Sequence, residues 1–173
     1  MRALLKRLGL FREERADPAA ARTVEAVVAN LRALGLHVEA RSYGPHFVEI
    51  FASTSPKLVT TPGGAEASGV ALLLAGKYDP PTLVFEEINS LNPGLGRRMV
   101  EAALQALAAQ ECPFRKVRVD DASPLGGDGL SFWRRAAAAH AWLEWEITEH
   151  ERARAAGESE GERELRKSWD GLK

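Results

Sequence analysis

The chain has 173 residues, 45% of them apolar and 27% charged, which suits one globular core and is too short for two domains. Its formal net charge of −1 excludes the global positive field that would attract nucleic acid or an anionic membrane. A single cysteine, Cys112, excludes an intrachain disulfide, and no run reaches the ~20 apolar residues of a transmembrane helix, so we expect a cytoplasmic protein.

Residues 1–16 have an amphipathic pattern. The basic residues Arg2, Lys6 and Arg7 are interspersed with large apolar ones, and acidic residues follow where a signal peptide would continue with apolar residues. This pattern predicts a short helix packed on the domain. The alternative is a helix that binds a membrane surface or a partner protein.

The first strong element is a helix over residues 17–34. Asp17 suits the N-cap, Pro18 suits the first turn, and Gly35 follows where a left-handed cap ends a helix. The apolar residues recur at helical spacing and predict one buried stripe. They are Val24, Val27, Val28, Leu31 and Leu34.

A region of strands comes next. Residues 37–43 alternate in polarity, Gly44 and Pro45 interrupt them, and an apolar run resumes at 47–52, which predicts a hairpin. Further strands are predicted over 58–61, 69–75 and 82–90. Asp79, Pro80 and Pro81 predict the turn between the last two.

The second half alternates helices and strands. A helix is predicted over 94–110 because apolar residues again form a stripe, and Pro113 stops any continuation. A short strand over 115–120, a loop rich in Gly, Pro and Asp over 121–129 and a helix over 132–142 should follow. Residues 143–147 form either a last strand or a continuation of that helix, which would place Trp133, Trp142 and Trp145 on one helical side.

This order of elements predicts one mixed α/β domain over residues 17–148. Residues 1–16 precede it, and the highly charged residues 149–173 follow it as a solvated helix or a partly disordered tail.

The most informative segment is the glycine turn between the strand at 82–90 and the next helix. Gly94 and Gly96 open that helix, and Arg97 and Arg98 follow. The first amides of a helix have no partners within the helix, and the helix dipole adds positive charge, so this position suits a phosphate group. Alternatively, the glycines only make a tight connection between strand and helix.

The residues Leu91-Asn92-Pro93-Gly94-Leu95-Gly96 resemble the pyrophosphate-binding motif of the GNAT superfamily of acyl-CoA-dependent N-acyltransferases, which reads Gln/Arg-x-x-Gly-x-Gly/Ala. The resemblance covers roughly residues 72–145. It implies a GNAT-like fold, in which a central, mostly antiparallel sheet is flanked by helices and contains a strand–glycine turn–helix–strand unit. It also implies transfer of an acetyl group from acetyl-CoA to an amine of a small molecule or a protein.

The resemblance also assigns roles to residues. Those that would hold the acyl donor are Ile88, Ser90, Asn92, Gly94, Leu95, Gly96, Arg97 and Arg98. Glu86 or Glu87 would be the catalytic base that removes a proton from the amine. Adjacent strand residues point to opposite faces, so only one of the two faces the cleft, and Glu86 would share a face with Val84 and Ile88.

Two positions depart from the family's pattern. Leu91 replaces the polar first residue of the motif, and Trp133 occupies the place of a tyrosine that protonates the departing thiolate, which an indole cannot do. These departures favour an alternative, a non-catalytic GNAT-like subunit that binds a ligand or a protein. Its partner, or a second copy, would bind through the tryptophan-bearing C-terminal region.

Two further kinds of site are not expected. The four histidines, His37, His46, His140 and His150, are scattered without metal-ligand spacing, so no metal is predicted. Asp120 adjoins a loop whose spacing matches no calcium site. Nucleic-acid binding through Arg97, Arg98, Arg115, Lys116 and Arg118 is disfavoured by the near-neutral charge.

Overall fold

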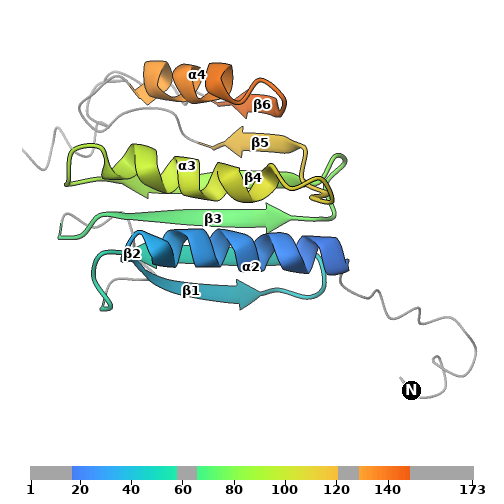
Figure 1. Ribbon diagram of the computed structural model, residues 1–173, viewed down its shortest axis with the longest axis horizontal. Helices are drawn as coiled ribbons and strands as arrows, with labels where there is room; N and C mark the ends of the chain where they lie inside the picture. The colour runs from blue at the N-terminus through green and yellow to red at the C-terminus, as the bar shows by residue number, and fades with distance from the viewer. Residues whose placement is uncertain (1–16, 58–65, 121–128, 149–173) are drawn as a thin grey trace, which may run out of the picture.

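The computed structural model describes residues 17–57, 66–120 and 129–148. In these residues the elements follow one another in the order α2, β1, β2, β3, β4, α3, β5, α4 and β6 (Figure 1). The predicted segments at 1–16, 58–61 and 149–173, and the loop at 121–128, lie outside the described residues.

Helix α2 spans Pro18–Ala33 and begins and ends as its sequence predicts. The side chain of Asp17 accepts a hydrogen bond from the main-chain N–H of Ala19 at 2.9 Å, which caps the helix. Gly35 follows the end of the helix with a φ of 80°, a conformation that glycine adopts without steric cost. Local capping therefore determines both ends of α2.

The sheet has six strands in the order β1-β2-β3-β4-β5-β6, so β1 and β6 are its edges among the described residues. The strands are β1 His37–Ser42, β2 Phe47–Ser53, β3 Gly69–Ala75, β4 Thr82–Asn89, β5 Lys116–Val119 and β6 Glu144–Ile147. The first four pair antiparallel, whereas β5 and β6 add in parallel. The predicted hairpin is confirmed as β1–β2, and the predicted mixed α/β class is confirmed too.

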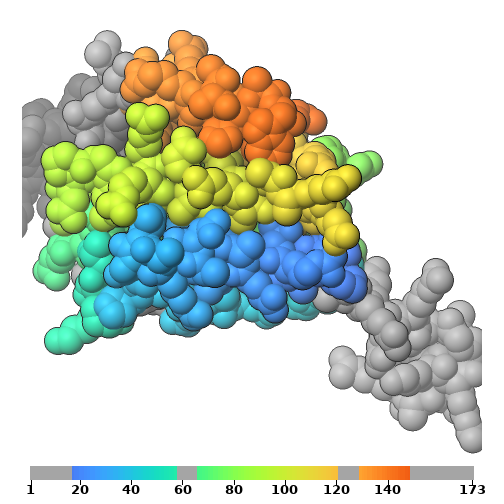
Figure 2. Space-filling view, viewed as in Figure 1, coloured from blue at the N-terminus to red at the C-terminus, as the bar shows by residue number. Residues whose placement is uncertain are grey.

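Helix α3 spans Leu95–Leu107 and connects β4 to β5, while α4 spans Gly129–Ala139 and connects β5 to β6. Because both are crossovers between parallel neighbours, right-handed connections place both helices on the same face of the sheet. Figure 1 shows α2, α3 and α4 over that one face, and Figure 2 shows them as adjoining bands. Within the described residues, no helix covers the opposite face.

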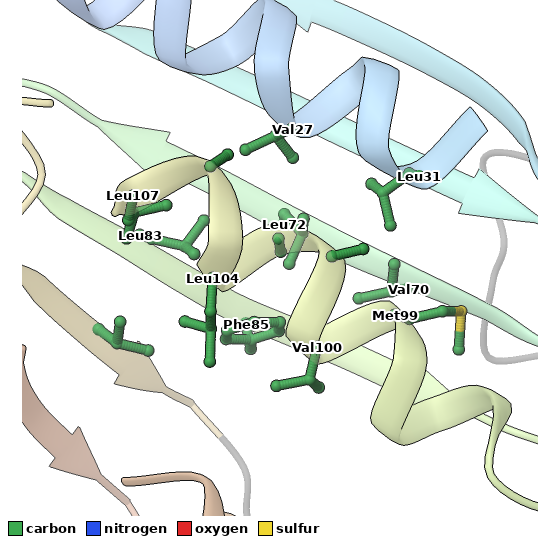
Figure 3. Packing of buried hydrophobic residues seen from close by; sticks show 14 of the residues in the cluster. Val27, Leu31, Val70, Leu72, Leu83, Phe85, Met99, Val100, Leu104 and Leu107 are labelled. Carbon is green, nitrogen blue, oxygen red and sulfur yellow. The ribbon is translucent and has the colours of Figure 1, made fainter. Parts of the chain in front are cut away.

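The core lies between this face and the helices (Figure 3). Val27 and Leu31 of α2 are fully buried, as are Leu104 and Leu107 of α3. They pack on inward-facing strand residues, of which Leu72, Leu83 and Phe85 are labelled in the figure. Strand residues that belong to this core alternate with residues on the opposite face, and this alternation decides which side chains are available for function.

Candidate functional site

A β-bulge interrupts β4 at Glu86. Phe85 pairs with Leu72 and Glu87 pairs with Ala71, so Glu86 is an extra residue with no partner in β3. A bulge bends its strand and turns the following side chains to the other face. The bulge therefore changes which side of the sheet each residue near the end of β4 occupies.

The parallel pairing of β4 with β5 stops at the same point. The last paired residues are Phe85 and Val119, and the main-chain N–H of Asp120 then donates to the carbonyl of Phe85 at 3.2 Å. β4 continues beyond Phe85, and residues 86–88 have no described strand on the β5 side. We call residues 86–88 the open edge of β4. Within the described residues, no hydrogen bond joins the main-chain groups of this segment to a strand on that side.

The turn after β4 is held by hydrogen bonds from side chains. Ser90 Oγ donates to the carbonyl of Asn92 at 2.7 Å and accepts from the main-chain N–H of Gly96 at 3.0 Å. The main-chain N–H of Leu91 donates to Ser68 Oγ at 2.8 Å, while the Leu91 side chain is exposed. The turn is therefore fixed by Ser90 and Ser68.

Both glycines have a structural reason to be there. Gly94 precedes α3 with a φ of 78°, in the left-handed region that disfavours other residues. A Cβ on Gly96 would lie 3.1 Å from the Cβ of Ser90. The turn geometry thus gives a reason for Gly94, and the close contact with Ser90 gives one for Gly96.

The amides at the start of α3 are only partly free. The N–H of Leu95 donates to the carbonyl of Asn92 at 3.1 Å, and that of Arg98 donates to the carbonyl of Gly94 at 3.1 Å. Gly96 is bonded to Ser90. Within the described residues, the N–H of Arg97 has no hydrogen-bond partner. One amide and the helix dipole therefore remain for an anion without rearrangement.

Three arginines surround this helix start. Arg97 and Arg98 are exposed on α3, and Arg135 is exposed on α4. Arg97 and Arg135 line a groove of about 210 Å³ between the two helices. Its floor is formed by Val100, Phe132 and Ala136. The sequence did not indicate Arg135, because the contact between α3 and α4 depends on the sheet that carries them.

Glu86 belongs to a group of charged residues on the face without helices. Glu49 and Arg118 alternate with core residues along β2 and β5, so they lie on that face. Desolvation by neighbouring groups and repulsion from Glu49 and Asp120 raise the pKa of Glu86 although its side chain is exposed, and Arg118 opposes that shift. A raised pKa makes this carboxylate a better proton acceptor than a free one.

Arg118 links this group to an aromatic cluster. Its Nε lies 2.6 Å from Asp120 Oδ1, and its guanidinium lies 5.5 Å from the ring centre of Tyr78. The Tyr78 ring contacts Phe47 edge-on at 6.1 Å between centroids. No sequence pattern indicated this cluster, because Phe47 lies in β2, Arg118 in β5 and Tyr78 in the connection between β3 and β4, and only the fold brings them together.

The predicted common face of Val84, Glu86 and Ile88 is wrong for Ile88. Val84 lies opposite the helices, because its neighbours Leu83 and Phe85 belong to the core. After the bulge, Ile88 pairs with Val70 and packs against the same core. The Ile88 side chain is therefore part of the packing beneath α3, and Glu87 is exposed.

The tryptophans do not form one helical surface, because the strand is confirmed as the structure of residues 144–147 in place of the alternative helix continuation. Helix α4 ends at Ala139, and residues 144–147 form strand β6 instead of continuing the helix. Trp133 is buried against the ring of Phe85, with 5.0 Å between ring centroids. Trp145 donates to the carbonyl of His140 at 3.1 Å, and Trp142 is 46% exposed. Of these three, Trp142 presents the largest exposed fraction to a partner.

Among the described residues, no group of three or more His, Cys, Asp or Glu side chains gathers in a way that could hold a metal ion. No helix in the described ranges combines the length and apolar character needed to cross a membrane.

Comparisons of this chain with protein-family models, with curated proteins and with solved structures find no match.

Proposed function

We propose that this protein is an N-acyltransferase that moves an acetyl group from acetyl-CoA to the amine of a small molecule or a protein. The observation that carries the proposal is the open edge of β4, which ends beside the first turn of α3. An extended acyl-pantetheine arm fits an unpaired strand edge, because it carries amides that can bond to the main chain as a strand does. The glycine motif at residues 91–96 supports the same function.

The donor's diphosphate would lie at the start of α3. The N–H of Arg97 is free within the described residues, and Asn92, Gly94 and Leu95 form the turn around it. The side chains of Arg97 and Arg98 supply positive charge. Arg135 lines the adjoining groove together with Arg97 and would add positive charge near the nucleotide end of the donor.

The chemistry follows from the groups around the bulge. The amine nitrogen attacks the thioester carbonyl, a C–N bond forms, the C–S bond breaks, and the sulfur departs as a thiolate. Glu86 accepts the proton that the amine loses, a role for which its raised pKa suits it. Main-chain N–H groups at Ile88 and Ser90 would stabilise the oxyanion. Trp133 is buried in the core and does not supply a proton to the thiolate.

Titration calorimetry with acetyl-CoA tests the proposal. We expect binding in the micromolar range for the full chain, weakened about tenfold by Arg97→Gln, Arg98→Gln or Arg135→Gln, as for loss of one charge-assisted phosphate contact. Arg134→Gln is the matched control, because this exposed arginine is the neighbour of Arg135 on α4 and does not line the groove. Absence of binding by the unsubstituted chain would contradict the proposal.

Turnover is measured by the release of the free thiol of coenzyme A over a panel of primary amines. Replacing Glu86 by Gln should reduce the rate at pH 7 by about a hundredfold, the usual contribution of a general base. Glu87→Gln, one residue along the same strand, is the control for the loss of a negative charge. Equal rates for the two variants would remove Glu86 from the mechanism.

A second candidate is a non-catalytic subunit that binds a ligand or another protein. Trp133 favours this alternative, because it is buried at the position where the resembled family carries a tyrosine that protonates the thiolate. The exposed Trp142 offers an anchor for a protein partner or a second copy. Tight binding of acetyl-CoA without turnover of any amine would select this function over catalysis.

A further inference from the structure

A separate apolar pocket lies at the other end of the sheet. It has a volume of about 260 Å³ and is bounded by the first turns of α2, the β1–β2 turn and the segments that lead into β4 and β5. The first turns of α2 form the right-hand end of that helix in Figures 1 and 2. Because α3 begins after the opposite end of β4, this pocket is distinct from the candidate donor site.

Apolar groups dominate the wall of the pocket. Val24, Val48, Leu74 and Phe114 contribute side chains, and Pro45 closes the side formed by the hairpin turn. Val24 and Val48 are only partly buried and pack on the edge of the core. An occupant that covered them would remove apolar surface from water, at a gain of about 25 cal/mol per Å².

The size of the pocket favours side chains over a whole ligand molecule. Drug-sized ligands and cofactors occupy pockets of ~300–1,000 Å³ that also carry a few converging polar groups. This pocket measures 260 Å³, and the side chain of Asp17 on its wall already caps α2. A peptide segment that inserts a few large apolar side chains fits this description.

We propose that residues 1–16 of the same chain dock in this pocket and insert side chains from residues 8–11. Three large apolar side chains are available there, Leu8, Leu10 and Phe11. Asp17 both lines the pocket and directly follows the segment. Phe11 precedes Asp17 by six residues, which span at most ~20 Å and so reach the pocket.

Tethering and charge favour this occupant. Covalent attachment gives the segment an effective concentration of the order of millimolar, which a free ligand does not have. Residues 1–16 contain five basic residues and two acidic ones, Glu13 and Glu14. The carboxylates on the pocket wall are Asp17 and Glu25. Opposite charges thus orient the segment towards the wall.

The test uses NMR of the full chain with its methyl groups labelled. Replacing Leu8, Leu10 and Phe11 by Ser should shift the methyl signals of Val24, Val48 and Leu74, which line the pocket. The methyl signals of Val70 and Met99, which do not line it, should stay in place. Adding a synthetic peptide of residues 1–16 to this triple variant should return the pocket signals towards those of the original chain.

The second variant fills the pocket with a bulky side chain. Ala21 is exposed on α2 and lines the pocket, whereas Ala29 is exposed on the same helix and does not. Ala21→Trp should weaken binding of the peptide to the triple variant by about tenfold or more, the effect of blocking a central anchor. Ala29→Trp should leave the affinity unchanged. Because both sites are exposed, both variants should fold.

Two outcomes would overturn the proposal. One is that the triple substitution leaves the pocket signals unmoved. The other is that the original chain binds vesicles of anionic lipid and the triple variant does not, while the peptide fails to move the pocket signals. The second result would assign the segment to a membrane surface. Neither result depends on acetyl-CoA binding, so the acyltransferase proposal stands or fails separately.

Discussion

Ser90 and Gly96 are joined across the turn between β4 and α3, where the N–H of Gly96 donates to Ser90 Oγ at 3.0 Å. The same hydroxyl donates to the carbonyl of Asn92. Six residues separate Ser90 from Gly96, so this contact replaces the usual N-cap, in which the capping side chain is two or three residues from the amide. The start of α3 is therefore held from the end of β4.

Removing this link should destabilise the protein. Ser90→Ala leaves the Gly96 amide without its partner and removes one of the two hydrogen bonds to the Asn92 carbonyl, and we expect a loss of about 1 kcal/mol in the free energy of unfolding. Urea unfolding followed by circular dichroism measures it. Ser42→Ala, at an exposed serine of β1, is the control and should change stability by less than about 0.5 kcal/mol. Equal losses would show that the Ser90 link contributes nothing.

Gly94 should tolerate asparagine better than alanine. Its φ of 78° is unfavourable for alanine by about 1–2 kcal/mol, whereas asparagine visits this region more readily. A Cβ there meets nothing within 4 Å, so backbone conformation rather than a clash sets the cost. Thermal unfolding should rank the melting temperatures as glycine, then asparagine, then alanine. The reverse order of the two substitutions would contradict this account.

Glu86 should make stability depend on pH. Its pKa is raised in the folded state, so the folded protein holds this proton more tightly than the unfolded chain, and ionisation of Glu86 disfavours folding as pH rises. Glu86→Gln should therefore stabilise the protein at pH 7. The gain should shrink as pH falls through the raised pKa and vanish below the unfolded value of 4.5.

Urea unfolding of Glu86→Gln at pH 7 and pH 4 measures this gain. Because Glu86 is exposed, we expect a small effect, below about 1 kcal/mol. Glu87→Gln provides the baseline for removing a carboxylate from the same strand. A gain for Glu86→Gln that is the same at both pH values would point to a cause other than ionisation.

Trp133 and Trp142 should differ sharply in their contribution to stability. Trp133 is 3% exposed and packs against Phe85, so Trp133→Ala should cost about 3–5 kcal/mol through the cavity it leaves. Trp142 is 46% exposed, and Trp142→Ala should cost less than about 1 kcal/mol. Guanidinium unfolding compares the two. A large loss for Trp142→Ala would contradict its exposed position.

Local sequence signals predicted most of the fold. Asp17 and Gly35 marked the ends of α2, and the alternation around Gly44 gave the β1–β2 hairpin, because capping and turn chemistry act over a few residues. The bulge at Glu86 could not be predicted, because it exists only in the pairing of β4 with β3. The prediction for Ile88 failed for the same reason.

Only the part of the candidate site that is formed by residues close together in the sequence was predicted. The glycine turn and Arg97 are visible within six residues of sequence, whereas Arg135 reaches the same groove from α4. The Ser90 link to Gly96 was equally hidden, because serines in turns have several alternative partners. These parts of the site depend on contacts between separate helices and strands, which a sequence pattern does not show.

The two edge strands affect how this protein behaves at high concentration. An unpaired strand edge is a template for aggregation, and charged side chains on a short strand prevent it. β6 has four residues, and its Glu144 and Glu146 both bind Lys116 of β5. β1 carries Glu39 and Arg41, bonded to each other at 2.7 Å. The charged side chains on both edge strands therefore disfavour the edge-to-edge pairing from which fibrils grow.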